Sequence, residues 1–98
     1  MGFRHVVLFK WKSDSTSEQR DAAIEALRQW GRDAEQYGAL TFGTDAGLAE
    51  GNWDTAVVVD LPDRDAYLAY AADERHQKMI AEYIRPILAE RAAVQHET

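Results

Sequence analysis

Residues 3–11 carry apolar side chains on both faces of the strand that their composition predicts. This run is rich in β-branched and aromatic residues, which favour strands. One alternating set of side chains is Phe3, His5, Val7, Phe9 and Trp11. The other set, Arg4, Val6, Leu8 and Lys10, has its charges only at the two ends. Because a strand that is apolar on both sides needs cover on both sides, the fold must provide a second layer on each face of its sheet.

Spacing and capping residues predict the next elements. Apolar residues recur at three- and four-residue steps over residues 15–36, which predicts an amphipathic helix. Ser15 and Glu18 have the spacing of a capping box at its start, and Gly38 ends it. A second strand is predicted over residues 39–45, followed by a loop that contains Gly47, Gly51 and Asn52. A third strand is predicted over residues 54–61.

The last third of the chain predicts a split helix and a final strand. Pro62 closes the third strand, and Asp63 caps a short helix through Ala72. After a break over residues 73–75, a second helix runs to about Arg85, where Pro86 stops it. The last strand is predicted over residues 87–96. The order strand, helix, strand, strand, split helix, strand is that of a ferredoxin-like α+β fold with a four-stranded antiparallel sheet.

A ferredoxin-like sheet has helices on one face and leaves the other face bare. Here the bare face would be apolar, and such a patch is too large to leave in water. Two copies that pack these faces together would form a closed barrel. We therefore expect a homodimer with a dimeric α+β barrel.

Composition restricts the class of function further. The 98 residues have room for a single domain, residues 1–98, and the formal net charge of -6 disfavours nucleic acid and anionic lipid as partners. There is no cysteine, and the three histidines lack metal-ligand spacing. No glycine pattern suits a phosphate site, so we expect no metal and no cofactor. No apolar run is long enough for a signal peptide or a membrane span, so we expect a cytoplasmic protein.

Two places could carry chemistry. His5 is the one titratable residue on its apolar strand face, and Tyr67, Tyr70 and His76 flank the break between the two short helices. Imidazole and phenol groups can exchange protons or hold a carbonyl oxygen. The alternative interpretation is structural: His5 is a neutral core histidine bonded to the backbone, the tyrosines and Met79 are core residues at helical spacing, and His76 is solvated.

Several segments together resemble the Dabb family of stress-responsive dimeric A/B barrel proteins, over nearly the whole chain. They are the opening residues 4–12 (RHVVLFKWK), Thr16-x-x-Gln19, the strand over residues 54–61, Tyr67-x-x-Tyr70 with His76 six residues on, and residues 83–86 (YIRP). The resemblance implies a ferredoxin-like protomer, a homodimer joined through its sheets, and a cavity between sheet and helices in each protomer. One departure is that residues 73–76 (DERH) keep only the final histidine of the family's His-Pro-x-His.

The resemblance also implies site residues. A plant polyketide cyclase of this family closes its substrate by aldol condensation without metal or cofactor, and its catalytic positions correspond to His5, Tyr70 and His76. Leu27 stands where that cyclase has a second cavity tyrosine and Ile87 where it has a tryptophan, so the pocket shape must differ. We expect a small-molecule substrate whose binding residues are Val7, Phe9, Leu27, Val57, Tyr67, Met79 and Ile87.

Three functional hypotheses follow. The first is a cofactor-free cyclase, lyase or isomerase in which His76 is the base, Tyr70 is hydrogen-bonded to His76, and His5 holds an oxygen of a small apolar carbonyl, polyketide-like or aromatic substrate. The second is a non-catalytic, stress-related binding dimer. The third, a cofactor-free monooxygenase, rests on fold analogy. An open cavity of about 300 Å³ or more that both His5 and His76 reach would favour chemistry.

Overall fold

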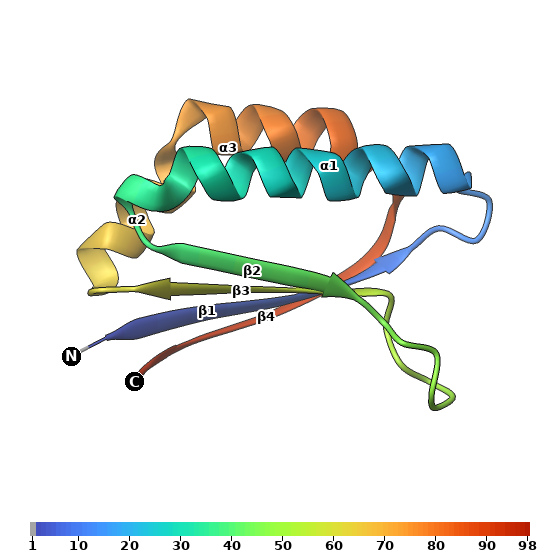
Figure 1. The fold of residues 1–98 in the computed structure, drawn as a ribbon, viewed down its shortest axis with the longest axis horizontal. Helices are drawn as coiled ribbons and strands as arrows, with labels where there is room; N and C mark the ends of the chain where they lie inside the picture. Colours follow the sequence, from blue (N-terminus) through green and yellow to red (C-terminus); the bar gives the residue numbers. More distant parts are fainter. Residues whose placement is uncertain (1) are drawn as a thin grey trace.

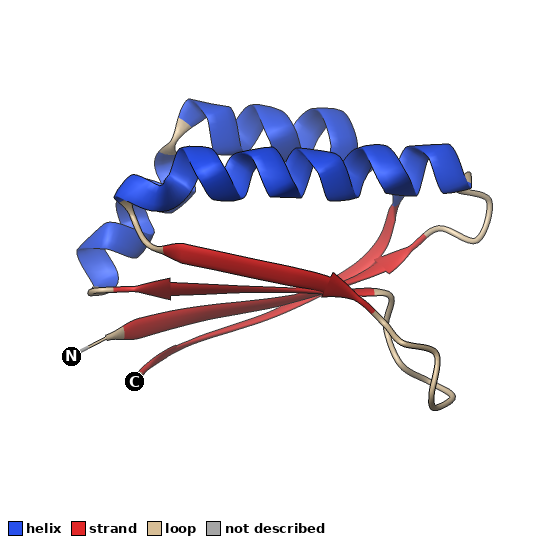
Figure 2. Cartoon of the chain, in the orientation of Figure 1, coloured by secondary structure: helices blue, strands red, loops and turns tan. Residues whose placement is uncertain are grey.

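The computed structural model describes residues 2–98 as one antiparallel sheet with a layer of helices on one of its faces (Figure 1). The strands are β1 (Phe3–Trp11), β2 (Ala39–Thr44), β3 (Thr55–Leu61) and β4 (Leu88–Glu97). The α-helices are α1 (Ser17–Asp33), α2 (Arg64–Ala72) and α3 (Glu74–Met79). The four strands lie in the order β2-β3-β1-β4 with every neighbouring pair antiparallel. The predicted ferredoxin-like arrangement is confirmed, and Figure 2 shows its two layers.

The first helix starts later than its sequence predicts. Thr16, not Ser15, is the cap: its hydroxyl accepts from the Gln19 amide at 3.1 Å, and the Gln19 side chain accepts from the Thr16 amide at 2.9 Å. Ser15 is unavailable because its hydroxyl donates to the Lys12 carbonyl at 2.6 Å in the preceding turn. The capping box predicted for Ser15 and Glu18 is therefore wrong by one residue.

This helical segment ends at Gln36, as its spacing predicts, but its last turn and the role of Gly38 differ from the prediction. A 3-10 turn, Ala34–Gln36, follows α1, and Gly38 is not among the glycines with positive φ. Its role is close packing, because a Cβ at Gly38 would collide with the carbonyl of Asp60 on β3. The residue thus marks where the chain passes tightly onto the sheet, rather than a left-handed helix cap.

The split helix is confirmed, with a different ending. Asp63 caps α2 by accepting from the Ala66 amide, and Asp73 caps α3 by accepting from the Arg75 amide. After α3 the chain continues through a π turn, Ile80–Ile84, and a 3-10 turn, Arg85–Ile87. Pro86 lies inside this last turn. The first N–H groups of a helical turn have no partner within the turn, so a proline, which lacks the N–H, is tolerated there. The helical path therefore ends at Ile87 rather than at Arg85.

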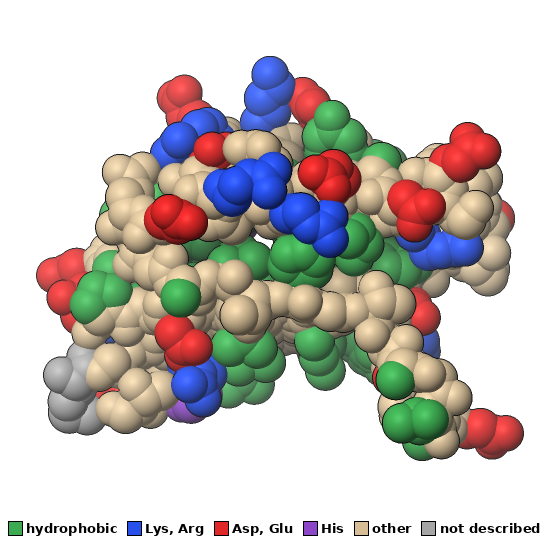
Figure 3. Space-filling model, in the orientation of Figure 1, with side chains coloured by type: hydrophobic (Ala, Val, Ile, Leu, Met, Phe, Trp, Pro, Cys, Tyr) green, Lys and Arg blue, Asp and Glu red, His purple; other side chains and the backbone are tan. Residues whose placement is uncertain are grey.

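The two faces of the sheet have different cover. The alternating β1 side chains from Phe3 to Trp11 are buried against the helices together with Val57, Val59 and Leu61 of β3. The opposite face of the strands is apolar and open: Leu8 is 39% exposed and Val94 is 62% exposed. Figure 3 shows hydrophobic side chains gathered on this underside of the sheet. Two faces of one strand thus require two different covers, as its sequence predicts.

The β2–β3 loop projects on the side of the open face (Figure 1). Gly47 and Gly51 have positive φ, where a Cβ would be strained. The Asp45 side chain holds the loop by accepting from the Gly47 amide and from the Asn52 side chain, both at 3.0 Å. Leu48 is 90% exposed. Among residues 2–98, no helix combines the length and apolarity needed to cross a membrane.

Candidate active site

A cavity of about 370 Å³ lies between the sheet and the helices. Its lining includes all three predicted catalytic residues, which are His5, Tyr70 and His76. Of the predicted substrate-binding residues, six line it: Val7, Phe9, Leu27, Val57, Tyr67 and Met79. Ile87 does not, because its side chain is buried in the core at the end of the 3-10 turn. The cavity therefore combines apolar side chains from both the sheet and the helices with three groups that can exchange protons, His5 from β1 and Tyr70 and His76 from the helices.

His5 lies in the middle of the sheet on the helix side, and its side chain is 5% exposed. Gln95, directly opposite on β4, donates its amide N–H to the His5 Nδ1 at 2.9 Å. With Nδ1 as the acceptor, a neutral imidazole carries its proton on Nε2. Burial lowers the pKa of His5 to about 4, and the positive charges of Arg91 and His76 add to this effect. At neutral pH His5 is thus an uncharged hydrogen-bond donor.

The surroundings of His76 favour the opposite tautomer. Its Nδ1 lies 3.4 Å from the Ala71 carbonyl oxygen, a long contact in which the nitrogen can only donate. The Nε2 lone pair is then free to accept a proton. The imidazole stacks on Trp30, with ring centroids 5.2 Å apart. Burial lowers the pKa of His76, while the Ala71 carbonyl and the Asp73 charge oppose that change, so the ring is a neutral base near pH 7.

Tyr70 contacts both imidazoles through its ring. Its centroid lies 4.7 Å from that of His76 and 6.3 Å from that of His5. No hydrogen bond joins Tyr70 to His76 among residues 2–98, so that part of the sequence-based mechanism is not present here. The Tyr70 side chain is 3% exposed. Burial raises the pKa of Tyr70 to about 12, against a smaller lowering by the nearby Trp30 indole, so the phenol keeps its proton.

The junction between α2 and α3 is held by a network around Asp73. The carboxylate accepts from the Tyr37 hydroxyl at 2.7 Å and pairs with the Arg75 guanidinium at 2.9 Å. The hydrogen bonds from Arg75 and Tyr37 hold the pKa of Asp73 well below its usual range. Because Asp73 also caps α3, this network fixes the backbone three residues before His76. This network and the stacking on Trp30 therefore hold the half-buried His76 in place.

Sequence reasoning missed several residues around the cavity. The cavity is also lined by Gln77, Ile80, Ile84, Arg85, Leu88 and Arg91. Gln95 is not among the lining residues but forms a hydrogen bond with His5. The alternation of the last strand places Arg91 and Gln95 on one face, but it does not show which β1 residue each opposes. That information lies in the β1–β4 register. Among the described residues, no group of three His, Asp or Glu side chains is placed to hold a metal ion.

Comparison with known proteins identifies the family. The family model of the stress-responsive A/B barrel domain, Dabb, matches residues 3–97. The chain belongs to this family, as its resemblance predicts. A search among curated proteins found no significant match.

Solved structures share the fold over their whole length. A dimeric ferredoxin-like protein of unknown function from Thermobifida fusca is 40% identical, with a TM-score of 0.90 over 100% of this chain and 92% of its own. A Dabb family protein from Mesorhizobium loti is 13% identical, with a TM-score of 0.82 over 99% and 96%. Hydroxynitrile lyase from Passiflora edulis is 17% identical, with a TM-score of 0.83 over 99% and 93%. The last two likenesses establish the fold alone.

Proposed function

We propose that this protein is a homodimeric enzyme that moves a proton at a carbon next to a carbonyl group, as in a cyclase, lyase or isomerase, without a cofactor. The observation that carries the proposal is that two imidazoles line one cavity and that their hydrogen-bond partners favour opposite tautomers. His76 offers an unprotonated Nε2, and His5 offers an Nε2–H. An acceptor and a donor that are both neutral near pH 7 are the two groups that enolisation needs.

The reaction assigns one step to each group. His76 takes the proton from the carbon, and the electron pair of the broken C–H bond moves into the carbonyl to form an enolate. The His5 Nε2–H donates a hydrogen bond to the enolate oxygen, where charge develops. His76, now an imidazolium, returns its proton to the carbon or to a leaving oxygen. Tyr70, which keeps its proton because of its raised pKa, is a second donor available to that oxygen.

The cavity wall supports a substrate with an apolar body. Val7, Phe9 and Val57 are each 4% exposed and form the sheet side, and Leu27 and Met79 close the helix side. An apolar wall that excludes water strengthens the hydrogen bonds to a developing charge. The volume of about 370 Å³ exceeds the roughly 300 Å³ at which small-molecule sites begin. A small aromatic or polyketide-like carbonyl compound is the substrate class that fits.

The homodimer is part of this proposal. The open sheet face is apolar, and the 40% identical Thermobifida fusca protein is described as dimeric. Packing two such faces together removes Leu8 and Val94 from water and gives β1 its second cover. A cytoplasmic location remains a prediction from the sequence.

Deuterium exchange tests the proposed chemistry with model ketones in place of the natural substrate. Small aryl methyl ketones are incubated with the protein in D₂O, and loss of the methyl proton signal is followed by NMR. We expect His76→Gln and His5→Gln each to slow catalysed exchange by about 10²- to 10⁴-fold. The matched control is His96→Gln, since His96 is exposed and pairs with Arg4, on the other sheet face. Equal exchange in all four proteins contradicts the assignment.

An absence of exchange with every ketone would favour the second hypothesis, a non-catalytic binding dimer. Dioxygen uptake in the same incubations would favour the monooxygenase hypothesis, in which the substrate is oxidised rather than isomerised.

A further inference from the structure

Two arginines line the cavity without a partner of opposite charge. Seven of the eleven Lys and Arg side chains form ion pairs within residues 2–98, as expected for a protein with a net charge of -6. Arg85 and Arg91 form neither an ion pair nor a side-chain hydrogen bond in this part of the chain, although the protein has 17 carboxylates. No Asp or Glu is among the residues that line the cavity. The cavity is therefore a positive site in an acidic protein.

The β1–β4 register directs Arg91 toward the cavity. Arg91 pairs with Phe9, as Gln95 pairs with His5, and directly opposed residues share a sheet face. Phe9 and His5 both face the helices, so Arg91 does as well. Its positive charge contributes to lowering the pKa of both His5 and His76, which places the guanidinium within electrostatic reach of the two imidazoles. Arg85 reaches the same cavity from the 3-10 turn just before β4.

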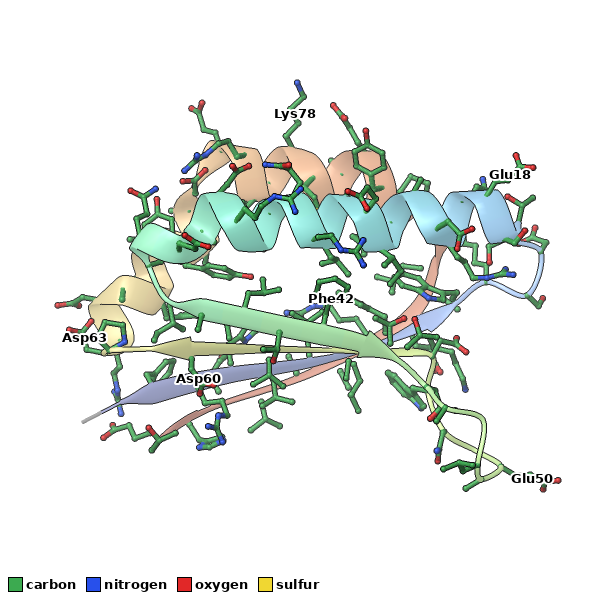
Figure 4. The ribbon with its side chains drawn as sticks, in the orientation of Figure 1. Glu18, Phe42, Glu50, Asp60, Asp63 and Lys78 are labelled. Carbon is green, nitrogen blue, oxygen red and sulfur yellow. The ribbon has the colours of Figure 1, made fainter. Side chains whose placement is uncertain are left out.

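Glu90, the acidic residue next to Arg91 in sequence, and four labelled acidic side chains lie away from the cavity (Figure 4). Figure 4 shows four acidic side chains, Glu18, Glu50, Asp60 and Asp63, directed away from the space between the sheet and the helices. Glu90, the acidic neighbour of Arg91 in sequence, lies on the opposite face of β4 and pairs with Lys10 at 3.3 Å. Arg85 and Arg91 are themselves exposed and so mark the mouth of the cavity. An anion that enters the cavity meets both of them first.

Arg91 and His5 enter the cavity from different places along the β1–β4 strand pair. Phe9, beside Arg91, and His5, beside Gln95, are four residues apart on β1, which is about 13 Å along a strand. The wall between these two positions is apolar. A guanidinium matches a carboxylate through two parallel hydrogen bonds. The apolar wall matches a planar or aliphatic body, and the two imidazoles match a carbonyl group.

We propose that Arg91 and Arg85 form a carboxylate-binding subsite, and that the substrate is a small keto acid with an aromatic or otherwise apolar body rather than a neutral ketone. This inference rests on the proposed function, because it names the substrate class of the same cavity. The carboxylate anchors at the mouth, and the ketone reaches His5 and His76. The arginines bind and orient the substrate and do not take part in proton transfer.

Binding of two matched probes tests the subsite. 4-Acetylbenzoate and its neutral isostere 4-acetylbenzamide differ only in the charged group, and their dissociation constants are measured by NMR titration at fixed ionic strength. Because hydrogen bonds to charged groups are worth more than neutral ones, we expect the carboxylate to bind about 10- to 100-fold more tightly than the amide. In Arg91→Met this ratio falls to near one, and in Arg85→Gln it falls part of the way.

The control is Arg64→Gln, an exposed arginine on α2 outside the cavity, which leaves the ratio unchanged. Equal affinity for the two probes, or failure of the carboxylate to bind at millimolar concentration, overturns the subsite. A ratio that survives in Arg91→Met does the same. The two proposals fail separately: if the wild type prefers the carboxylate probe but catalyses no deuterium exchange, the subsite stands and the catalytic proposal fails. His76→Gln should keep the preference for the carboxylate, because the arginines bind the substrate without taking part in proton transfer.

Discussion

Acid should destabilise this protein through His5. The expected loss of unfolding free energy follows from the burial of the His5 side chain. The side chain is 5% exposed and its pKa is lowered from 6.5 to about 4, first by burial and then by the charges of Arg91 and His76. In the unfolded chain the imidazole recovers its ordinary pKa and binds a proton below about pH 6.5. The folded state does not bind that proton until the pH approaches 4.

This difference in pKa determines the direction in which the unfolding free energy changes with pH. A histidine with a lowered folded-state pKa contributes stability above its unfolded pKa, and this contribution is lost as the pH falls through the interval from 6.5 to about 4. One pKa unit corresponds to about 1.4 kcal/mol, so the full difference is roughly 3 kcal/mol. At about pH 5 the folded protein has lost about 2 kcal/mol of unfolding free energy through this group alone.

Urea unfolding at about pH 7.5 and about pH 5 measures the effect, with the protein concentration held constant because the stability of a dimer depends on it. Acidification also acts on other groups of the protein, so the informative quantity is the difference between the wild type and His5→Gln. We expect the wild type to lose about 2 kcal/mol more than His5→Gln on acidification. His96→Gln, which changes an exposed histidine, should behave as the wild type does.

The outcome that refutes this reasoning is an equal loss of unfolding free energy in the wild type and His5→Gln. His5 would then have an ordinary pKa in the folded state, and the imidazole would be hydrated rather than enclosed by Tyr67, Tyr70 and Gln95. The donor role that we assign to it would lose its physical basis.

Three further predictions concern the sheet face, the site and the first helix. Leu8→Asp places a charge on the open sheet face, where Leu8 is 39% exposed, and we expect a monomer by size-exclusion chromatography with light scattering. A variant that is still dimeric would show that the interface is not this sheet face. Gln95→Leu removes the donor to His5 Nδ1 and should cost about 0.5 to 1.5 kcal/mol in urea unfolding; imidazole ¹⁵N shifts should report a mixture of tautomers, and an unchanged tautomer would show that Gln95 does not set it. Gly31→Ala should raise the unfolding free energy by about 0.5 to 1 kcal/mol, because the new Cβ would lie 3.4 Å from a Leu40 methyl group, an ordinary contact; a lower melting temperature would indicate crowding there.

Local chemistry in the sequence was sufficient to predict most of the fold. β1 occupies the predicted residues 3–11, and β2, β3 and β4 each lie within one residue of the predicted bounds. Strand alternation and apolar periodicity act over a few residues, and a chain of this length has few ways to combine them. The cap of α1 was misplaced by one residue because Ser15 and Thr16 both suit that role. The choice depends on which hydroxyl the Lys12 carbonyl engages.

Part of the candidate site could also be predicted, because some of its residues are placed by the same local patterns. His5, Tyr70 and His76 could be placed by the strand face, the helix junction and the family resemblance, and all three line the cavity. Ile87 was expected at the cavity but does not line it, because the helical path continues past Pro86 and places that side chain in the core. The expected hydrogen bond between Tyr70 and His76 depends on side-chain rotation, which no spacing in the sequence determines.

The sequence by itself determined that β1 would be apolar on both faces and that an imidazole would share a face with Phe3, Val7 and Phe9, since side-chain alternation in a strand is a local property. Only the tertiary structure decided which residues meet that imidazole. Gln95 lies 90 positions away, and it opposes His5 because of the β1–β4 register. A shift of one residue in that register would turn both Gln95 and Arg91 to the other face. The tautomer of His5 and the charge at the cavity mouth are therefore properties of strand pairing.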